Sequence, residues 1–352
     1  MPNAPRRRLQ ARLIAALLAI SLGTPAVPCT TFVMAGGHGP LFGRNYDFEF
    51  GEALVVVNPR GLKKSSDTGG ARWTARHGSV TFNQYGIGHP TGGVNEAGLV
   101  VELMWLDGSR YPEADARPTV ATLEFIQYLL DRSATLDDAL KAAGEVRITG
   151  RTPLHFLVAD RSGQGASVEF LEGRMVVHRG DRMPVTVLAN DDYASALARL
   201  PLYREFGGPQ SLPQDAGSLS RFARAAAGVR RASPQAGPAQ AFELLDGVAQ
   251  AGFTHWQIVY ELGRGMVHYR TAAQRSLRRI ELSRIDFACA AGMRLLNVDE
   301  GEGDMSGRWQ PYSRAVDEAQ LRIAYRKTSF LKHIPAEAAI EDAKSAEKMR
   351  CS

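Results

Sequence analysis

Cys29 is the residue whose position in the sequence most clearly favours chemistry. It follows a leader-like segment and begins the run Cys29-Thr30-Thr31-Phe32. If processing ends at Cys29, its thiol is a nucleophile. The freed α-amino group, with a pKa of about 7.7–8.0, then lies a few bonds away to act as base. An internal cysteine would need a separate histidine for this role. The competing interpretation is an ordinary thiol next to a processing site.

Residues 1–28 have the order of a secretory signal peptide. A basic start precedes a ten-residue apolar run, Leu13–Leu22, and then small residues at cleavage-site spacing. The run is shorter than the roughly 20 residues that span a bilayer. We therefore expect a periplasmic or secreted protein without stable membrane insertion. If cleavage falls after Ala26, Val27 and Pro28 must be removed later to expose Cys29.

The charge of the chain also reflects this leader. The sequence has 42 Lys and Arg against 37 Asp and Glu, and removing the four leader arginines leaves 38 against 37. A nearly neutral mature chain gives no basic surface for nucleic acid, so we expect no nucleic-acid partner. With 44% hydrophobic residues it has enough apolar material for a substantial core.

Three cysteines occur in the sequence: Cys29, Cys289 and Cys351. So few cysteines in an exported chain do not suggest a disulfide framework. We expect Cys289 to be a small buried apolar residue and Cys351 a residue of the tail. Cys29 would then be a thiol kept for chemistry.

The elements that must position these residues alternate in blocks. Strand patterns occupy both ends of the chain and helical patterns lie between them, which predicts an α+β fold rather than a βαβ repeat. A single domain is expected over 29–335, followed by a polar, loosely ordered tail, 336–352. The expected strands are Thr30–Met34, Leu41–Tyr46, Leu54–Val57, Ser79–Tyr85, Leu99–Leu106, Leu154–Ala159, Ala166–Leu171, Met175–Arg179, Val185–Leu188, Trp256–Glu261, Met266–Arg270 and Leu277–Leu282; the expected helices are Pro118–Arg132, Thr135–Ala143, Tyr193–Phe206, Ser218–Arg231, Ala239–Ala251 and Asp317–Lys327.

Several common catalytic and cofactor motifs do not occur. The sequence has no G-x-S-x-G elbow, no Walker A loop and no G-x-G-x-x-G fingerprint. Its eight histidines are scattered and none forms a short metal-binding spacing. We expect neither metal nor organic cofactor. His155, inside an apolar strand, is expected to be a hydrogen-bonded structural residue.

An ordered set of segments resembles the choloylglycine hydrolase family, which includes bile salt hydrolases and penicillin V acylases. Each segment is weak alone, but the set spans most of the chain in the family's order. Three features are more similar to the Gram-negative penicillin V acylase branch than to bile salt hydrolases of the gut: Trp105-Leu106, the leader, and Phe48 after Asp47. The loop Asp191-Asp192-Tyr193 departs from the family pattern. The matching segments are Cys29–Phe32, Gly43–Asp47, Gly93–Leu99, Leu154–Phe156 leading to Asp160, Val187–Asn190 and Ser220–Phe222.

The resemblance implies a four-layer αββα sandwich of the N-terminal-nucleophile hydrolase type, with Cys29 as nucleophile. Arg44 would lie beside the sulfur and favour the thiolate, and Asp47 would hold the α-amino group. Because residues three apart in a strand point to opposite faces, we expect a turn or bulge between these two. The competing interpretation is an exposed Arg–Asp pair.

The remaining site residues implied by the resemblance are more distant in sequence. Asn190 would donate from its amide to the oxyanion, and Trp105 would supply a backbone N–H and line the acyl pocket. Arg221 would complete the polar cluster, and Phe48 would shape the pocket. The alternatives are that Asn190 caps a helix, Trp105 is core and Arg221 is solvated. Asn95 is expected to shape a turn.

The expected function is hydrolysis of a linear amide C–N bond in a small N-acyl substrate, of the penicillin V or N-acyl-homoserine lactone kind. Conjugated bile salts are the alternative on the same fold. A different class is an exported lipoprotein or binding protein anchored through Cys29, although Pro28 disfavours lipid attachment. A papain-like thiol enzyme has no local signature here. The resemblance also implies a possible homo-oligomer, commonly a tetramer.

Overall fold

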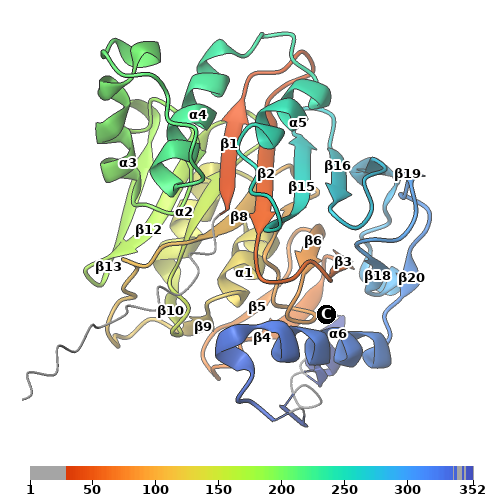
Figure 1. The fold of residues 1–352 in the computed structure, drawn as a ribbon. Helices are drawn as coiled ribbons and strands as arrows, with labels where there is room; N and C mark the ends of the chain where they lie inside the picture. The colour runs from red at the N-terminus through yellow and green to blue at the C-terminus, as the bar shows by residue number, and fades with distance from the viewer. Residues whose placement is uncertain (1–28, 336, 339–342, 345, 352) are drawn as a thin grey trace, which may run out of the picture.

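The computed structural model describes residues 29–335, 337–338, 343–344 and 346–351 (Figure 1). The predicted signal peptide therefore lies outside the described residues. Among the residues described, no helix is both long and apolar enough to cross a bilayer.

Two large, mainly antiparallel sheets form the centre of the molecule. The first has the strand order β14-β1-β2-β15-β16-β17-β19, and the second the order β13-β12-β11-β8-β7-β6-β3-β18-β20. In the first sheet the bounds are β1 Thr30–Met34, β2 Leu41–Asp47, β14 Val187–Leu188, β15 Thr254–Glu261, β16 Met266–Thr271, β17 Arg278–Glu281 and β19 Gly303–Asp304. In the second they are β3 Leu54–Asn58, β6 Ser79–Asn83, β7 Gly92–Asn95, β8 Val100–Trp105, β11 Leu154–Ala159, β12 Gly165–Leu171, β13 Arg174–Arg179, β18 Arg294–Asn297 and β20 Gln310–Pro311.

Helices cover the outer faces of both sheets, giving four layers (Figure 1). Helices α4 (Ser218–Arg231) and α5 (Pro238–Asp246) pack on β1, β2 and β15, whereas α1 (Glu124–Arg132) and α2 (Leu136–Glu145) pack on β7, β8 and β11. Short α3 (Tyr193–Arg199) contacts α4, and α6 (Arg314–Lys327) lies near the C-terminus. The predicted αββα sandwich is confirmed.

The main core lies between the two sheets. Its buried side chains come from facing strands, including Trp256 and Ile258 of the first sheet and Val55, Phe82 and Leu157 of the second. Strands buried on both faces read as continuous apolar runs, which explains why the sequence pattern located them. A second cluster under α1 and α2 joins those helices to the second sheet.

One predicted helix begins too early. Residues 119–121 of the expected helix Pro118–Arg132 instead form β9 (Thr119–Ala121), which pairs in parallel with β10 (Arg147–Thr149). The helix itself begins at Glu124. A Thr-Val pair favours strand, and the partner strand that decides the matter is distant in sequence.

The C-terminal tail differs from the expectation. A disulfide joins Cys289 to Cys351, so the prediction of three unpaired cysteines is wrong; among the described residues Cys29 is the free thiol. Cys289 is half-buried and Cys351 exposed, so neither is a core residue. The end of the tail forms β21 (Arg350–Cys351), which pairs with β4 (Leu62–Ser65) in a small sheet with β5 (Arg72–Thr74). The 62-residue separation of the cysteines gives no local signal for this pairing.

Candidate active site

Cys29 lies immediately before β1 and is 1% exposed. Its Sγ lies 3.7 Å from the backbone oxygen of Asp47, to which the thiol donates. Burial raises the pKa of the Cys29 thiol, and the Arg44 guanidinium opposes this rise, as Arg221 does more weakly. Activating the thiol therefore depends on nearby positive charge and a base.

Arg44 lies on β2 and points towards the second sheet. Its guanidinium donates to the Thr91 backbone oxygen at 2.9 Å, forms a fully buried ion pair with Glu102 and lies over the Tyr46 ring at 4.7 Å. The Tyr260 hydroxyl donates to the same carboxylate. A buried charge requires such partners, so Glu102 fixes the position of the guanidinium.

Asp47 lies on the opposite face of the same strand. Its carboxylate accepts from the Thr254 hydroxyl and, at 3.2 Å, from the Gln250 amide. Burial raises the pKa of Asp47 to about 7, while the bond from Thr254 and the Arg221 guanidinium act against the rise. The Thr254 hydroxyl and the Arg221 guanidinium therefore stabilise the ionised form of Asp47, which is the form that can hold a cation.

The expected turn between Arg44 and Asp47 is wrong. Strand β2 continues from Leu41 to Asp47, and the register shift lies in the partner strand β15, between Thr254 and Trp256. Arg44 and Asp47 both act electrostatically on the Cys29 thiol, although they lie on opposite faces of β2. This is possible because Cys29 precedes β1 at the end of the sheet, beside β2.

Asn190 and Arg221 form a linked pair behind the nucleophile. Arg221, buried on α4, donates to the Cys29 backbone oxygen at 2.6 Å and to the Thr30 hydroxyl. It also donates to Asn190 Oδ1 at 2.7 Å, and Asn190 Nδ2 donates to the Trp105 backbone oxygen at 2.9 Å. Because Oδ1 must accept from the guanidinium, the network sets the orientation of the amide.

The alternatives for these two residues do not describe the structure. Asp192, rather than Asn190, caps α3, since its carboxylate accepts from the Ser195 backbone N–H. Arg221 is fully buried rather than solvated. Their catalytic roles, and that of the Trp105 backbone N–H, stay predictions.

An apolar cavity of about 240 Å³ opens onto Cys29. Phe48 and Trp105, both expected at the pocket, lie on its wall together with Tyr46, Leu103 and Leu154. A further part of the wall comes from α6 and the turn after it, through Leu321, Tyr325, Phe330 and Leu331. The Phe330 ring lies 6.1 Å from that of Trp105. The thiol therefore faces a space suited to an apolar group.

Two residues expected to be structural have structural contacts. The buried His155 ring contacts Glu169 at 3.1 Å and the Ala189 backbone oxygen at 2.8 Å. The Asn95 amide donates to the backbone oxygens of Leu130, in the last turn of α1, and of Ser133, just after it, and its Oδ1 accepts from the Ala97 and Leu99 N–H groups. Both expectations are confirmed.

Sequence reasoning missed the supporting residues Glu102, Tyr260, Gln250 and Thr254. Only Glu102 had a readable signal, because a single acid inside the apolar run Val100–Met104 implies a buried partner. The other three carry no such signal, since tyrosine, glutamine and threonine are common at strand ends and edges.

Comparison with known proteins agrees with this arrangement. Residues 29–289 match the linear amide C–N hydrolases, choloylglycine hydrolase family. The chain is 28% identical over 260 residues to the penicillin V acylase of Pectobacterium atrosepticum, covering 67% of each.

Solved structures extend the similarity to the fold. Penicillin V acylase from Agrobacterium tumefaciens superposes with a TM-score of 0.72 at 25% identity, covering 81% of this chain and 98% of that one. A variant of conjugated bile acid hydrolase from Clostridium perfringens has a TM-score of 0.66 at 18% identity, with 78% and 98% covered, which shows a shared fold. The family match begins at the buried thiol Cys29 and spans every residue of the cluster around it: this chain belongs to the choloylglycine hydrolase family and is a hydrolase of linear amide C–N bonds.

Proposed function

We propose that this protein is an exported acylase that cleaves N-acyl compounds with a compact apolar acyl group, using Cys29 as an N-terminal nucleophile. Penicillin V and N-acyl-homoserine lactones are the substrate types. The observation that carries the proposal is the Cys29 thiol, which opens into an apolar cavity while Arg44, Asp47, Asn190 and Arg221 lie around it.

In the first step the freed α-amino group takes the thiol proton and Sγ attacks the amide carbonyl carbon. The carbonyl π electrons move to oxygen, and the Asn190 amide donates to the resulting oxyanion. An amide nitrogen carries two hydrogens, and the bond to the Trp105 oxygen uses one of them. Asp47 holds the α-ammonium while it carries the proton.

In the second step the C–N bond breaks, and the leaving nitrogen takes the proton from the α-ammonium. The acyl group remains on Sγ as a thioester. Water then attacks the thioester carbonyl with the α-amine as base, and the thiolate leaves and is reprotonated. The net reaction converts amide and water into acid and amine.

The size of the cavity supports a compact acyl group. Pockets for drug-sized ligands are typically about 300–1,000 Å³, and this cavity is about 240 Å³. A single aromatic ring or a medium acyl chain suits that volume better than the four fused rings of a bile acid. Tyr46, Phe48 and Trp105 offer ring surfaces against which an aryl group can pack.

Export is supported by the leader pattern and by the bond between Cys289 and Cys351. Disulfides form and persist in oxidising compartments, which include the periplasm and the extracellular space. The proposal also requires that Val27 and Pro28 be removed, because a peptide bond at the Cys29 nitrogen eliminates the base.

Mass spectrometry of the purified active enzyme combined with parallel assays tests this proposal. We expect a mature N-terminus at Cys29, hydrolysis of penicillin V or an acyl-homoserine lactone above that of glycocholate, and no activity in Cys29→Ala. Full activity with residues retained before Cys29 would refute the mechanism. Preferred hydrolysis of glycocholate would favour the bile salt alternative, and lipid on Cys29 without acylase activity would favour the anchored binding protein.

A further inference from the structure

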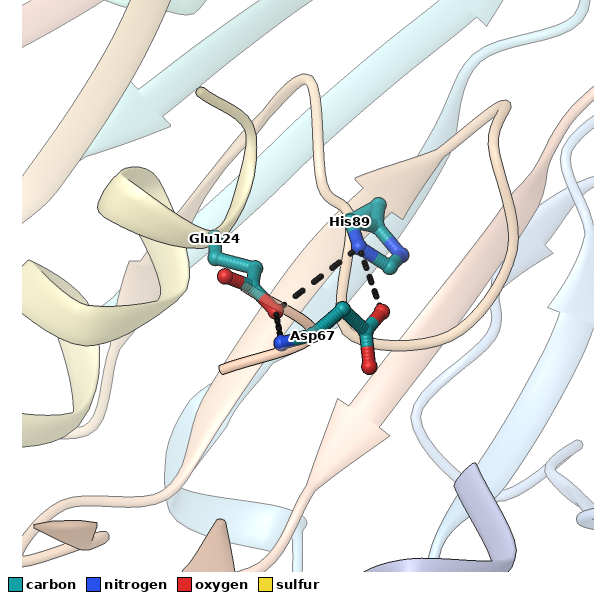
Figure 2. Close-up of side chains that lie close together, drawn as sticks. All are labelled: Asp67, His89 and Glu124. Atoms are coloured by element: carbon teal, nitrogen blue, oxygen red, sulfur yellow. Dashed lines mark hydrogen bonds and ion pairs between the residues drawn. The ribbon is translucent and has the colours of Figure 1, made fainter. Parts of the chain in front are cut away.

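A second cluster of chemically active side chains, drawn in Figure 2, adjoins the cavity that Cys29 lines, because His89 belongs to both. It consists of Asp67, in the turn between β4 and β5, His89, in the loop between β6 and β7, and Glu124, the first residue of α1. His89 Nε2 lies 3.3 Å from Asp67 Oδ2 and 4.0 Å from Glu124 Oε1. One ligand atom from each residue lies within 4.8 Å of the other two.

These distances fit three ligands around one small ion. Zinc bonds to histidine nitrogen and carboxylate oxygen are about 2.0–2.2 Å long, so neighbouring ligand atoms in a tetrahedral site are roughly 3–4 Å apart. The two distances from Nε2 fall in this range. A small cavity of about 20 Å³ is lined by all three residues, and one water-sized particle needs about 10–15 Å³.

Glu124 is held in place as a ligating carboxylate would be. Its Oε1 accepts from the Asp67 backbone N–H at 2.7 Å, and its Oε2 accepts from the Ala121 backbone N–H at 2.7 Å and from the Ser66 hydroxyl. An ionised carboxylate offers about four acceptor positions, so three donors leave room for one more partner. Such outer contacts orient metal ligands and raise their affinity.

The surrounding charge permits a cation at this place. The side chains of His89 and Asp67 are 20% and 35% exposed, which gives an ion a path from solvent. Two lysines line the same small cavity: the ammonium of Lys64 pairs with Asp131 at 2.8 Å, and Lys348 is an exposed residue at its rim. Two carboxylates therefore face the imidazole, and the buried lysine beside them, Lys64, is already neutralised by Asp131.

We propose that Asp67, His89 and Glu124 bind one divalent transition-metal ion of the zinc class, with water completing the coordination. A site with an imidazole nitrogen suits zinc better than calcium or magnesium, which prefer oxygen ligands alone. The ion joins the β4–β5 turn and the β6–β7 loop to the start of α1. Because His89 also lines the substrate cavity, the ion fixes one part of that wall.

The spacing of these residues explains why the sequence led us to expect no metal. The three ligands come from separate segments 22 and 35 residues apart, so no short motif marks them. The competing interpretation is a simple ion pair between His89 and Asp67, which requires no metal.

Calorimetric titration of ZnCl₂ into the full chain tests the proposal. The protein is prepared without a polyhistidine tag, treated with chelator, and carries Cys29→Ser so that zinc cannot bind the nucleophile thiol. We expect one equivalent of zinc to bind and to raise the melting temperature. Asp67→Asn and His89→Gln are expected to weaken binding at least about tenfold.

His268→Gln is the matched control, because His268 likewise pairs with a carboxylate, that of Glu261 at 3.2 Å, but lies outside the Asp67–His89–Glu124 cluster. We expect it to bind zinc like the parent chain. The proposal is overturned if the parent shows no saturable binding, if Asp67→Asn and His89→Gln bind as the parent does, or if calcium binds more tightly than zinc. These measurements do not depend on catalysis, so their outcome is separate from that of the acylase assay.

Discussion

Replacing Asn190 with alanine tests the oxyanion role most directly. In catalysis it removes one donor to the developing oxyanion, and such a donor is typically worth about 10²–10³ in kcat. In the fold it removes the bond from the Arg221 guanidinium at 2.7 Å and the bond to the Trp105 oxygen at 2.9 Å. A bond to a charged group contributes about 1.5–3 kcal/mol and a neutral one about 1 kcal/mol, so the expected destabilisation is about 2–4 kcal/mol.

The assay must separate these two effects. We expect kcat to fall by about two to three orders of magnitude with little change in KM, measured where circular dichroism shows the variant folded. Asp192→Ala is the neighbouring control, because it loses the cap of α3 at a cost of about 1 kcal/mol but is not among the residues that line the cavity at Cys29. The reasoning is refuted if folded Asn190→Ala keeps a third or more of the wild-type kcat, or if Asp192→Ala loses as much.

Three further predictions concern other parts of the molecule. Burial raises the pKa of Asp47 from 3.8 to about 7, so the folded chain that retains residues before Cys29 binds a proton that the unfolded chain has released. Its free energy of unfolding should therefore fall between about pH 4 and pH 7. Asp47→Asn should reduce this slope in urea titrations, and the part that remains includes that of Asp317, whose pKa burial raises to about 6; an unchanged slope would contradict the shift. Cys351→Ser opens a loop of 62 residues and should lower the free energy of unfolding by up to about 4 kcal/mol, whereas equal stability with and without the bond would show that it does not constrain the unfolded chain. Phe330→Ala should raise KM for an aryl-acetyl substrate by about tenfold, the equivalent of ~1.4 kcal/mol, while Leu202→Ala, similarly exposed but away from the cavity, should leave it unchanged; equal KM in both variants would exclude Phe330 from binding.

The elements that sequence reasoning located well are those fixed by local pattern. Strand β11 lies at Leu154–Ala159 and helix α4 at Ser218–Arg231, as expected, because an apolar run and an amphipathic repeat each define the element. Thr135 caps α2 through a capping box with Asp138, a pair whose residue types and spacing are typical of a helix start. Thr119–Ala121 was assigned wrongly because its partner strand is distant in sequence.

The site also divides into residues that local sequence patterns located and contacts that only the tertiary fold determines. Cys29, Arg44 and Asp47 were nominated by a linear order of motifs, and the structure brings them together with Asn190 and Arg221. The way Arg44 and Asp47 share one thiol across both faces of a continuous strand depends on the position of β1 beside β2. Contacts of this kind, the disulfide and the cluster at His89 arise from tertiary packing, and short-range patterns do not encode them.

The wall formed by Leu321, Tyr325, Phe330 and Leu331 lies beyond residue 289, where the family match ends. The groups proposed for bond cleavage lie within the matched region, whereas this part of the acyl pocket lies outside it. A substitution in α6 or the turn after it can therefore change which acyl group fits the cavity while leaving Cys29 and the groups around it unaltered.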